Sequence, residues 1–132
     1  LELDRDGDGY TPCSATGDCN DQLHIAWAPP GGAIGTAFLD VAFLQWSAPA
    51  DPGGSAYVYD VLRSDDPVSF ELDTVCVVYS SSLTFWEEET AVPALDRFFS
   101  YLVRVRNFCP PGQNLNMGTD SSGVPRVGRT CP

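Results

Sequence analysis

Alternation of apolar and polar residues along most of the chain predicts short β-strands. Residues 57–64 (YVYDVLRS) alternate large apolar side chains with Asp60, as in a strand with one buried face. Residues 98–107 (FFSYLVRVRN) repeat the period of two and place Arg104 and Arg106 opposite the apolar face. We therefore expect two half-buried strands whose polar residues face solvent.

Further β-forming segments are separated by turns rich in Pro, Gly, Ser and Asp. They are residues 36–47, 74–79, 83–87 and a short final strand near 124–127. The first of these is either two strands joined by a tight turn near Asp40 or one long bent strand. No segment shows a sustained helical period, so six or seven short strands predict an all-β fold, an antiparallel β-sandwich.

An acidic segment near the start of the chain has the spacing of a calcium-binding loop. Asp4, Asp6 and Asp8 fall at every second residue, and the intervening glycines allow the backbone to curl around one point. Calcium-binding loops supply oxygens from positions 1, 3, 5 and 7, the last as a backbone carbonyl. Counted from Asp4, those ligands are the three carboxylates and the carbonyl of Tyr10.

The usual loop closes with a glutamate at position 12, where this chain has Ala15. Asp18 and Asp21 are therefore the expected closing carboxylates, in a loop without helical periodicity. Oxygen ligands favour calcium over a transition metal. The alternative interpretation is a solvated acidic linker that binds no metal.

Residues 4–21, with a DxDGDG run followed by a DC-x-D element, resemble the calcium-binding repeats of the thrombospondin type 3 kind and a related bacterial motif. Residues 34–132 resemble a fibronectin type III domain. The residues that carry this second resemblance are Leu44, Trp46 and Pro49, then Tyr59 and Val61, then Leu95 and Tyr101. The resemblance implies a tryptophan under the core in the second strand and a corner that enters the sixth strand. The closing stretch, residues 101–132, is also similar to a subgroup of such domains in secreted bacterial proteins.

These observations divide the chain into a calcium-binding loop (1–22), a flexible Pro/Gly-rich link (23–35) and a fibronectin type III-like or immunoglobulin-like sandwich (36–132). The chain begins at Leu1 without a methionine. We therefore expect a processed product or a piece of a longer protein.

Five cysteines in a short acidic chain indicate disulfides and an oxidising compartment. Cys13 and Cys19 bracket the second half of the metal loop and are expected to pair. In an up-and-down sandwich, Cys76 and Cys131 lie at one pole and form the favoured second pair. Cys109 is then left at the opposite pole, unpaired or bonded to another chain, although its pairing with Cys76 or Cys131 stays open.

The net charge of −11 argues against nucleic acid or an anionic membrane as a partner. No apolar run is long enough to insert into a membrane. All seven basic residues are Arg, which excludes lysine isopeptide cross-links. We expect an extracellular protein, secreted or at the cell surface.

Catalysis is not expected in these residues. His24 is the sole histidine and lies in the Pro/Gly-rich link, away from any strand-end nucleophile. The acidic run at 87–89 beside Trp86 could form a sugar-binding patch, as could Trp27, but such a run more often marks a solvated strand edge.

Three functions remain. The preferred one is a non-catalytic calcium-binding structural or assembly module of a surface layer, adhesin or filament, whose partners are other protein subunits or copies of itself. The second is an accessory domain of a secreted bacterial hydrolase. The third is a carbohydrate-binding module that contacts glycans through Trp86 or Trp27.

Overall fold

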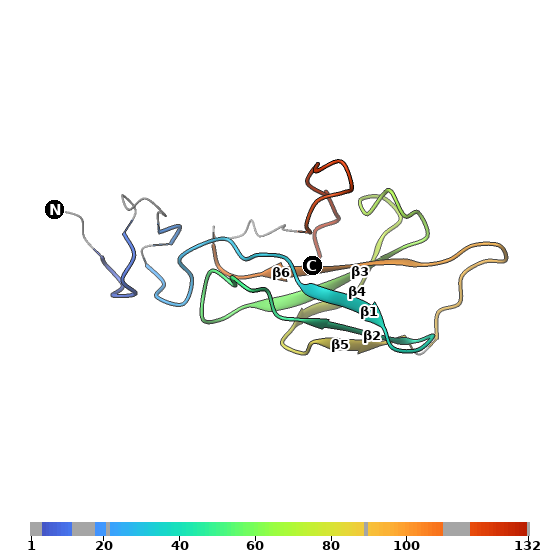
Figure 1. Cartoon of the computed structure of the whole chain (residues 1–132), viewed down its shortest axis with the longest axis horizontal. Coiled ribbons are helices and arrows are strands. Elements are labelled where there is room, and N and C mark those ends of the chain that lie inside the picture. Colours follow the sequence, from blue (N-terminus) through green and yellow to red (C-terminus); the bar gives the residue numbers. More distant parts are fainter. Residues whose placement is uncertain (1–3, 12–17, 21, 89, 110–116, 132) are drawn as a thin grey trace.

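The computed structural model describes residues 4–11, 18–20, 22–88, 90–109 and 117–131. Within these ranges the chain is all-β and contains no helix, so none is long and apolar enough to cross a membrane. The strands are β1 (Ile34–Phe38), β2 (Phe43–Ser47), β3 (Val58–Ser64), β4 (Val75–Ser81), β5 (Phe85–Glu87) and β6 (Ser100–Arg106). They form two antiparallel sheets, ordered β1-β2-β5 and β4-β3-β6, as expected for an antiparallel all-β chain (Figure 1).

The main hydrophobic core joins the two sheets. Its buried members are Leu44 and Trp46 from β2, Tyr59 and Val61 from β3, and Val103 and Val105 from β6. The Trp46 and Tyr59 rings meet edge to face across the core, with centroids 5.5 Å apart. Burial of the inward residues of both sheets stabilises this layered arrangement and is compatible with a β-sandwich.

Residues 34–47 form two strands, which decides between the alternatives left open by the sequence. β1 and β2 are antiparallel neighbours, and residues 39–42 connect them. Asp40 Oδ1 accepts hydrogen bonds from the backbone N–H groups of Ala42 (2.8 Å) and Phe43 (2.9 Å). The aspartate side chain thus fixes the turn that separates the strands.

The prediction that β3 and β6 each expose a polar face is wrong. Asp60 in β3 is fully buried, and Arg104 in β6 is 1% exposed. The reason is that part of the segment 117–131 covers the outer face of the sheet β4-β3-β6. There Leu62, Phe70, Met117 and Cys131 form a second buried cluster.

The segment expected to form a final strand, residues 124–127, contains no strand. The described C-terminal residues make only isolated bridges, between Thr119 and Pro125 and between Phe70 and Gly128. The segment passes over the sheet instead of extending it. This path explains why the polar residues in the alternating patterns of β3 and β6 are not all exposed to solvent.

The predicted link between the acidic segment and the sandwich is hydrogen-bonded to the connection between β2 and β3. The backbone N–H groups of Trp27 and Ala28 both donate to the Gly53 carbonyl at 2.9 Å, and β1 begins inside the predicted link, at Ile34. A Cβ atom at Gly53 would lie 2.0 Å from the Ala28 carbonyl oxygen, and the φ angle there is +64°. Glycine is therefore required for this close approach.

Candidate metal centre

The acidic segment forms a tight loop organised by the side chain of Asp4. Asp4 Oδ1 accepts a hydrogen bond from the Gly7 N–H at 2.7 Å, and Asp4 Oδ2 accepts one from the Gly9 N–H at 3.0 Å. Both glycines have positive φ, 79° at Gly7 and 91° at Gly9. Glycine adopts this left-handed conformation without steric cost, which lets the chain fold back around Asp4.

Asp6 and Asp8 each hold the backbone with one carboxylate oxygen and bury the other. Asp6 Oδ1 accepts from the Asp8 N–H at 3.2 Å, and Asp8 Oδ1 accepts from the Tyr10 N–H at 2.8 Å. The second oxygen of each carboxylate, Oδ2, is buried and has no hydrogen-bond partner within the described part of the chain. A buried carboxylate oxygen without a donor is costly, so both oxygens are suited to a cation.

Asp4, Asp6 and Asp8 converge as their spacing predicts. One carboxylate oxygen from each lies within 4.8 Å of the others. Three anionic groups this close repel one another unless a positive charge lies between them. A hard dication that accepts oxygen ligands fits this donor set best.

Asp18 lies next to the end of the loop. Its backbone N–H donates to the Thr11 carbonyl at 2.9 Å, and its Oδ1 accepts from the Asn20 N–H at 2.9 Å. The residue is 9% exposed. Among the described residues, Asp18 does not belong to the group of carboxylates formed by Asp4, Asp6 and Asp8, so its role as a closing ligand stays a prediction. The other predicted closing ligand, Asp21, lies outside the described residues.

Side-chain contacts attach the acidic segment to the rest of the chain. The Tyr10 and Trp27 rings stack, with centroids 5.4 Å apart and planes 5° apart. Asn20 Nδ2 donates to the Phe108 carbonyl at 3.2 Å, beyond the end of β6. The predicted metal ligand Tyr10 is thus also a packing residue.

The disulfides correct one predicted pair. Cys19 bonds to Cys109, with Cα atoms 5.5 Å apart, so Cys19 does not pair with Cys13 and Cys109 is not unpaired. Cys13 lies outside the described residues. The prediction failed because Cys19 lies beside the end of β6, a proximity that spacing along the chain does not reveal.

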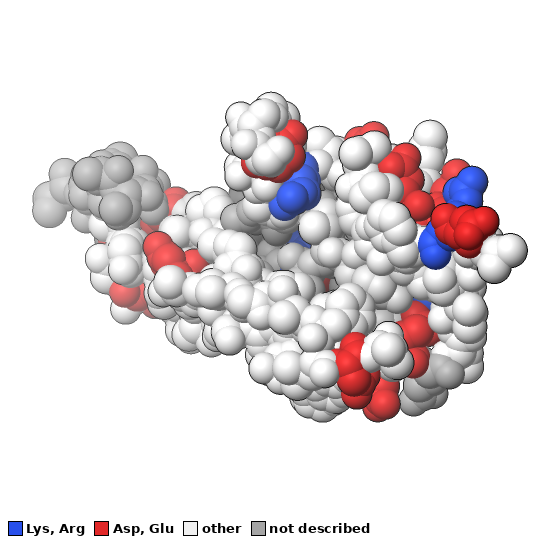
Figure 2. All heavy atoms as spheres, turned by 45° about the vertical axis from the view of Figure 1, so that its right-hand side comes forward, with Lys and Arg blue, Asp and Glu red and all other residues white. Residues whose placement is uncertain are grey.

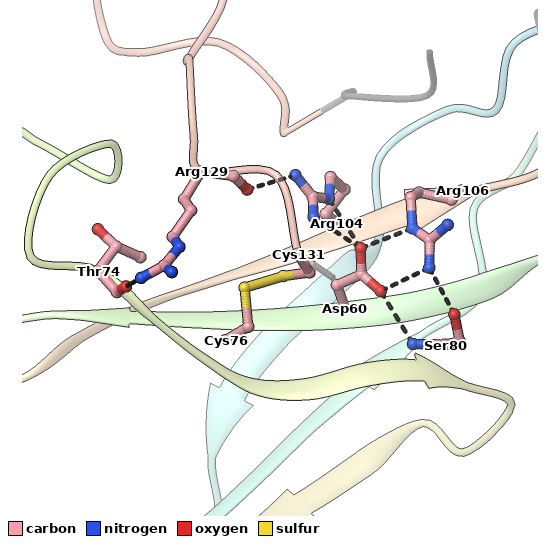
Figure 3. The surroundings of a disulfide bond; sticks show 8 residues. All are labelled: Asp60, Thr74, Cys76, Ser80, Arg104, Arg106, Arg129 and Cys131. Carbon is pink, nitrogen blue, oxygen red and sulfur yellow. Dashed lines mark hydrogen bonds and ion pairs between the residues drawn. A yellow bond between two sulfur atoms is a disulfide. The ribbon is translucent and has the colours of Figure 1, made fainter. Parts of the chain in front are cut away.

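The second disulfide is the pair favoured from the sequence. Cys76 in β4 bonds to Cys131, with Cα atoms 5.9 Å apart. It fastens the end of the described chain to the outer face of the sheet (Figure 3).

A charged cluster beside this disulfide was missed by the sequence analysis. Asp60 Oδ2 accepts hydrogen bonds from Arg104 Nη2 at 2.7 Å and from Arg106 Nε at 2.6 Å (Figure 3). Asp60 Oδ1 accepts from Arg106 Nη2 and from the Ser80 N–H, both at 2.9 Å. Burial opposes ionisation of Asp60, but the hydrogen bonds from Arg106, Ser80 and Arg104 outweigh it and lower its pKa below the ordinary value.

Arg129 completes the cluster from the C-terminal segment. Its carbonyl accepts from Arg104 Nη1 at 2.9 Å, and its own Nη1 donates to the Thr74 carbonyl at 2.8 Å (Figure 3). Arg129 thus connects the C-terminal segment both to β6 and to the residue before β4. In the sequence, the cluster is indicated only by the alternating pattern of β6, which places Arg104 and Arg106 on the same face of the strand.

The two tryptophans considered as glycan contacts both have aromatic partners. Trp27 stacks on Tyr10, and the partly buried Trp86 packs against the core with its ring centroid 5.6 Å from that of Tyr101. Glu88 beside Trp86 forms an ion pair with Arg63. These contacts give both tryptophans a packing role, and their contact with glycans stays a prediction.

Comparison with models of protein families finds no match, and comparison with curated proteins finds none either.

Proposed function

We propose that this chain is a non-catalytic, extracellular calcium-binding module that serves as a rigid structural or assembly unit. The observation that carries the proposal is the convergence of Asp4, Asp6 and Asp8, with the buried Oδ2 atoms of Asp6 and Asp8 lacking hydrogen-bond donors in the described chain. Calcium would supply the positive charge, and Asp18 and the Tyr10 carbonyl would contribute further oxygens. In this role the metal stabilises a loop and performs no chemistry.

The connections between the loop and the sandwich support a bracing role. The Tyr10–Trp27 stack joins the acidic segment to the link, and the Cys19–Cys109 disulfide joins it to the sandwich. Ordering the loop around calcium would therefore also restrict the chain that leads into β1. The two disulfides favour an oxidising, extracellular location.

A fibronectin type III-like sandwich remains our proposal for the fold family. Trp46 is buried in the second strand and Tyr101 lies in the sixth, as the resemblance implies. Leu95 departs from it, because this residue is 92% exposed and does not pack at the corner before β6. The support therefore comes from the sheet order and the core, and the corner provides none.

Calorimetric titration with calcium tests the proposal. We expect the full chain to bind calcium with a dissociation constant of about 0.1–1 mM, the range of extracellular modules. The double substitution Asp6→Asn and Asp8→Asn removes the two inward-facing charges and should abolish binding. Asp96→Asn is the matched control, because Asp96 is exposed and its positive φ is tolerated by asparagine.

Light scattering in calcium and in chelator tests the assembly role. The proposal expects species larger than one chain in calcium and smaller species after chelation. If the mass equals that of one chain in calcium and in chelator, assembly through calcium is rejected. The calcium site itself is tested separately by the calorimetric titration.

A further inference from the structure

A cleft of about 850 Å³ opens beside the charged cluster and is lined in part by Arg104 and Arg106 of that cluster. Its walls come from the ends of β3, β4 and β6 and include the aromatic residues Tyr57, Tyr79 and Phe108. Tyr79 is 51% exposed and Phe108 is 55% exposed. Clefts of this size, mostly apolar with a few polar groups, are typical binding sites.

The charge of the cleft is opposite to that of the chain. The chain has 18 acidic and 7 basic residues, and acidic side chains are spread over the face shown in Figure 2. The described residues that line the cleft include Arg104 and Arg106 and no Asp or Glu. The cleft is therefore a local site for negative charge on an acidic surface.

Asp60 does not neutralise both arginines. It carries one negative charge, accepts hydrogen bonds from Arg104 and Arg106, and is fully buried behind them. Two guanidinium groups and one carboxylate leave one net positive charge. Arg104 is enclosed, whereas the side chain of Arg106 is 24% exposed and lies over the Tyr79 ring, 4.9 Å from its centroid. Arg106 therefore presents the excess charge to the cleft.

We propose that this cleft binds an extended peptide segment of a partner protein, with an acidic side chain paired to Arg106 and an adjacent apolar side chain on Tyr79 and Phe108. Charge complementarity selects the carboxylate, and exposed aromatic residues beside an arginine are typical of protein interaction sites. The inference deepens the proposed assembly role and rests on it for the source of the peptide. The residues that line the cleft belong to the sandwich, and one of them, Phe108, accepts a hydrogen bond from Asn20 of the acidic segment through its backbone carbonyl.

Peptide titration of the full chain, followed by amide chemical shifts, tests this inference. The probe is a capped tripeptide with a central glutamate between two leucines, and its counterpart carries glutamine in the centre. We expect the acidic peptide to shift the amide signals of Tyr79, Arg106 and Phe108. It should bind about tenfold more tightly than the neutral peptide, because a hydrogen bond between charged groups contributes about a factor of ten or more in affinity.

Substitutions locate the binding. Arg106→Gln should weaken the acidic peptide about tenfold, and Arg97→Gln, which removes an exposed guanidinium elsewhere, should leave it unchanged. Because Arg106 also supports Asp60, a second variant, Ser82→Trp, fills the cleft without removing a charge. It should also prevent binding, with Ser82→Ala as its control.

Three results would overturn the inference. Equal binding of the glutamate and glutamine peptides would exclude recognition of the carboxylate. Full binding by Ser82→Trp would place the peptide outside the cleft. Acetate that competes as strongly as the peptide would identify a site for small anions rather than for a protein segment. The peptide titration is repeated in chelator, where no calcium is bound. Its outcome is therefore independent of the outcome of the calcium titration.

Discussion

The ring of Tyr10, at the end of the acidic loop, stacks on the ring of Trp27 with centroids 5.4 Å apart and planes 5° apart. Trp27 is held in turn by its backbone N–H, which donates to the Gly53 carbonyl at 2.9 Å. The stack therefore places the loop against a link that is already fixed to the sandwich. Calcium affinity should depend on this aromatic contact.

Replacing Trp27 with alanine should weaken calcium binding about two- to tenfold, because an aromatic pair contributes about 0.5–1.5 kcal/mol beyond its buried area. Trp27→Phe keeps a ring in place and serves as the control. Calorimetry measures both. Equal affinities of the alanine variant and the parent would mean that the stack does not order the loop.

The two disulfides should be distinguishable by their effect on calcium. The bond between Cys19 and Cys109 closes a separation of 90 residues, and removing it with serines should cost about 2–5 kcal/mol of unfolding free energy. Because Cys19 is adjacent to Asp18, this variant should also bind calcium more weakly. The matched control removes the bond between Cys76 and Cys131, with a separation of 55 residues.

The control variant should lose stability and keep its calcium affinity, since that bond lies beside the charged cluster and not beside the metal loop. Urea unfolding and calorimetry provide the two readouts. The same loss of calcium affinity in both variants would indicate general destabilisation instead of a specific connection.

The close approach at Gly53 predicts a steric effect. Gly53→Ala introduces a Cβ atom 2.0 Å from the Ala28 carbonyl oxygen at a positive φ, so the link must move away from the sandwich. We expect faster hydrogen exchange at Trp27 and Ala28 and a lower melting temperature. Gly32→Ala is the control, because a Cβ there meets nothing within 4 Å. Unchanged exchange in Gly53→Ala would contradict the docked link.

Asp60 should make stability depend on pH. Its folded-state pKa lies below the ordinary value of about 3.9, so its contribution is fully present above that value. The contribution is lost as the pH falls through the folded-state pKa, because the unfolded chain takes up the proton more readily. Asp60→Asn should cost about 3–5 kcal/mol at neutral pH, since it leaves Arg104 buried without its partner.

Urea unfolding in chelator, measured from neutral pH to about pH 3, tests this contribution. The parent and Asp96→Asn should lose more stability on acidification than Asp60→Asn. Identical pH dependence of all three would show that Asp60 does not carry the effect.

The periodic pattern of the sequence located most strands because alternation reflects the pleat of a β-strand directly. It could not reveal that Asp60 and Arg104 are buried, since that depends on residues 117–131 crossing the sheet, a contact between distant segments. The register places Asp60 opposite Arg104 on neighbouring strands. Sequence alone does not specify which strands are neighbours.

The convergence of Asp4, Asp6 and Asp8 was predictable because the contacts that produce it are local. Asp4, Asp6 and Asp8 are brought together by hydrogen bonds to backbone groups two to five residues away. The partner of Cys19 was not predictable, because Cys109 is 90 residues away. Its proximity results from the docking of the link.

Thermal unfolding in calcium and in chelator tests most directly the claim that calcium braces the whole module. With about 10 mM calcium and a dissociation constant of about 0.1–1 mM, ligand binding should stabilise the fold by about 1.4–2.7 kcal/mol. The account predicts a single unfolding transition at higher temperature in calcium for the parent and no shift for the Asp6→Asn, Asp8→Asn variant. The same unfolding temperature of the parent in calcium and in chelator would contradict it.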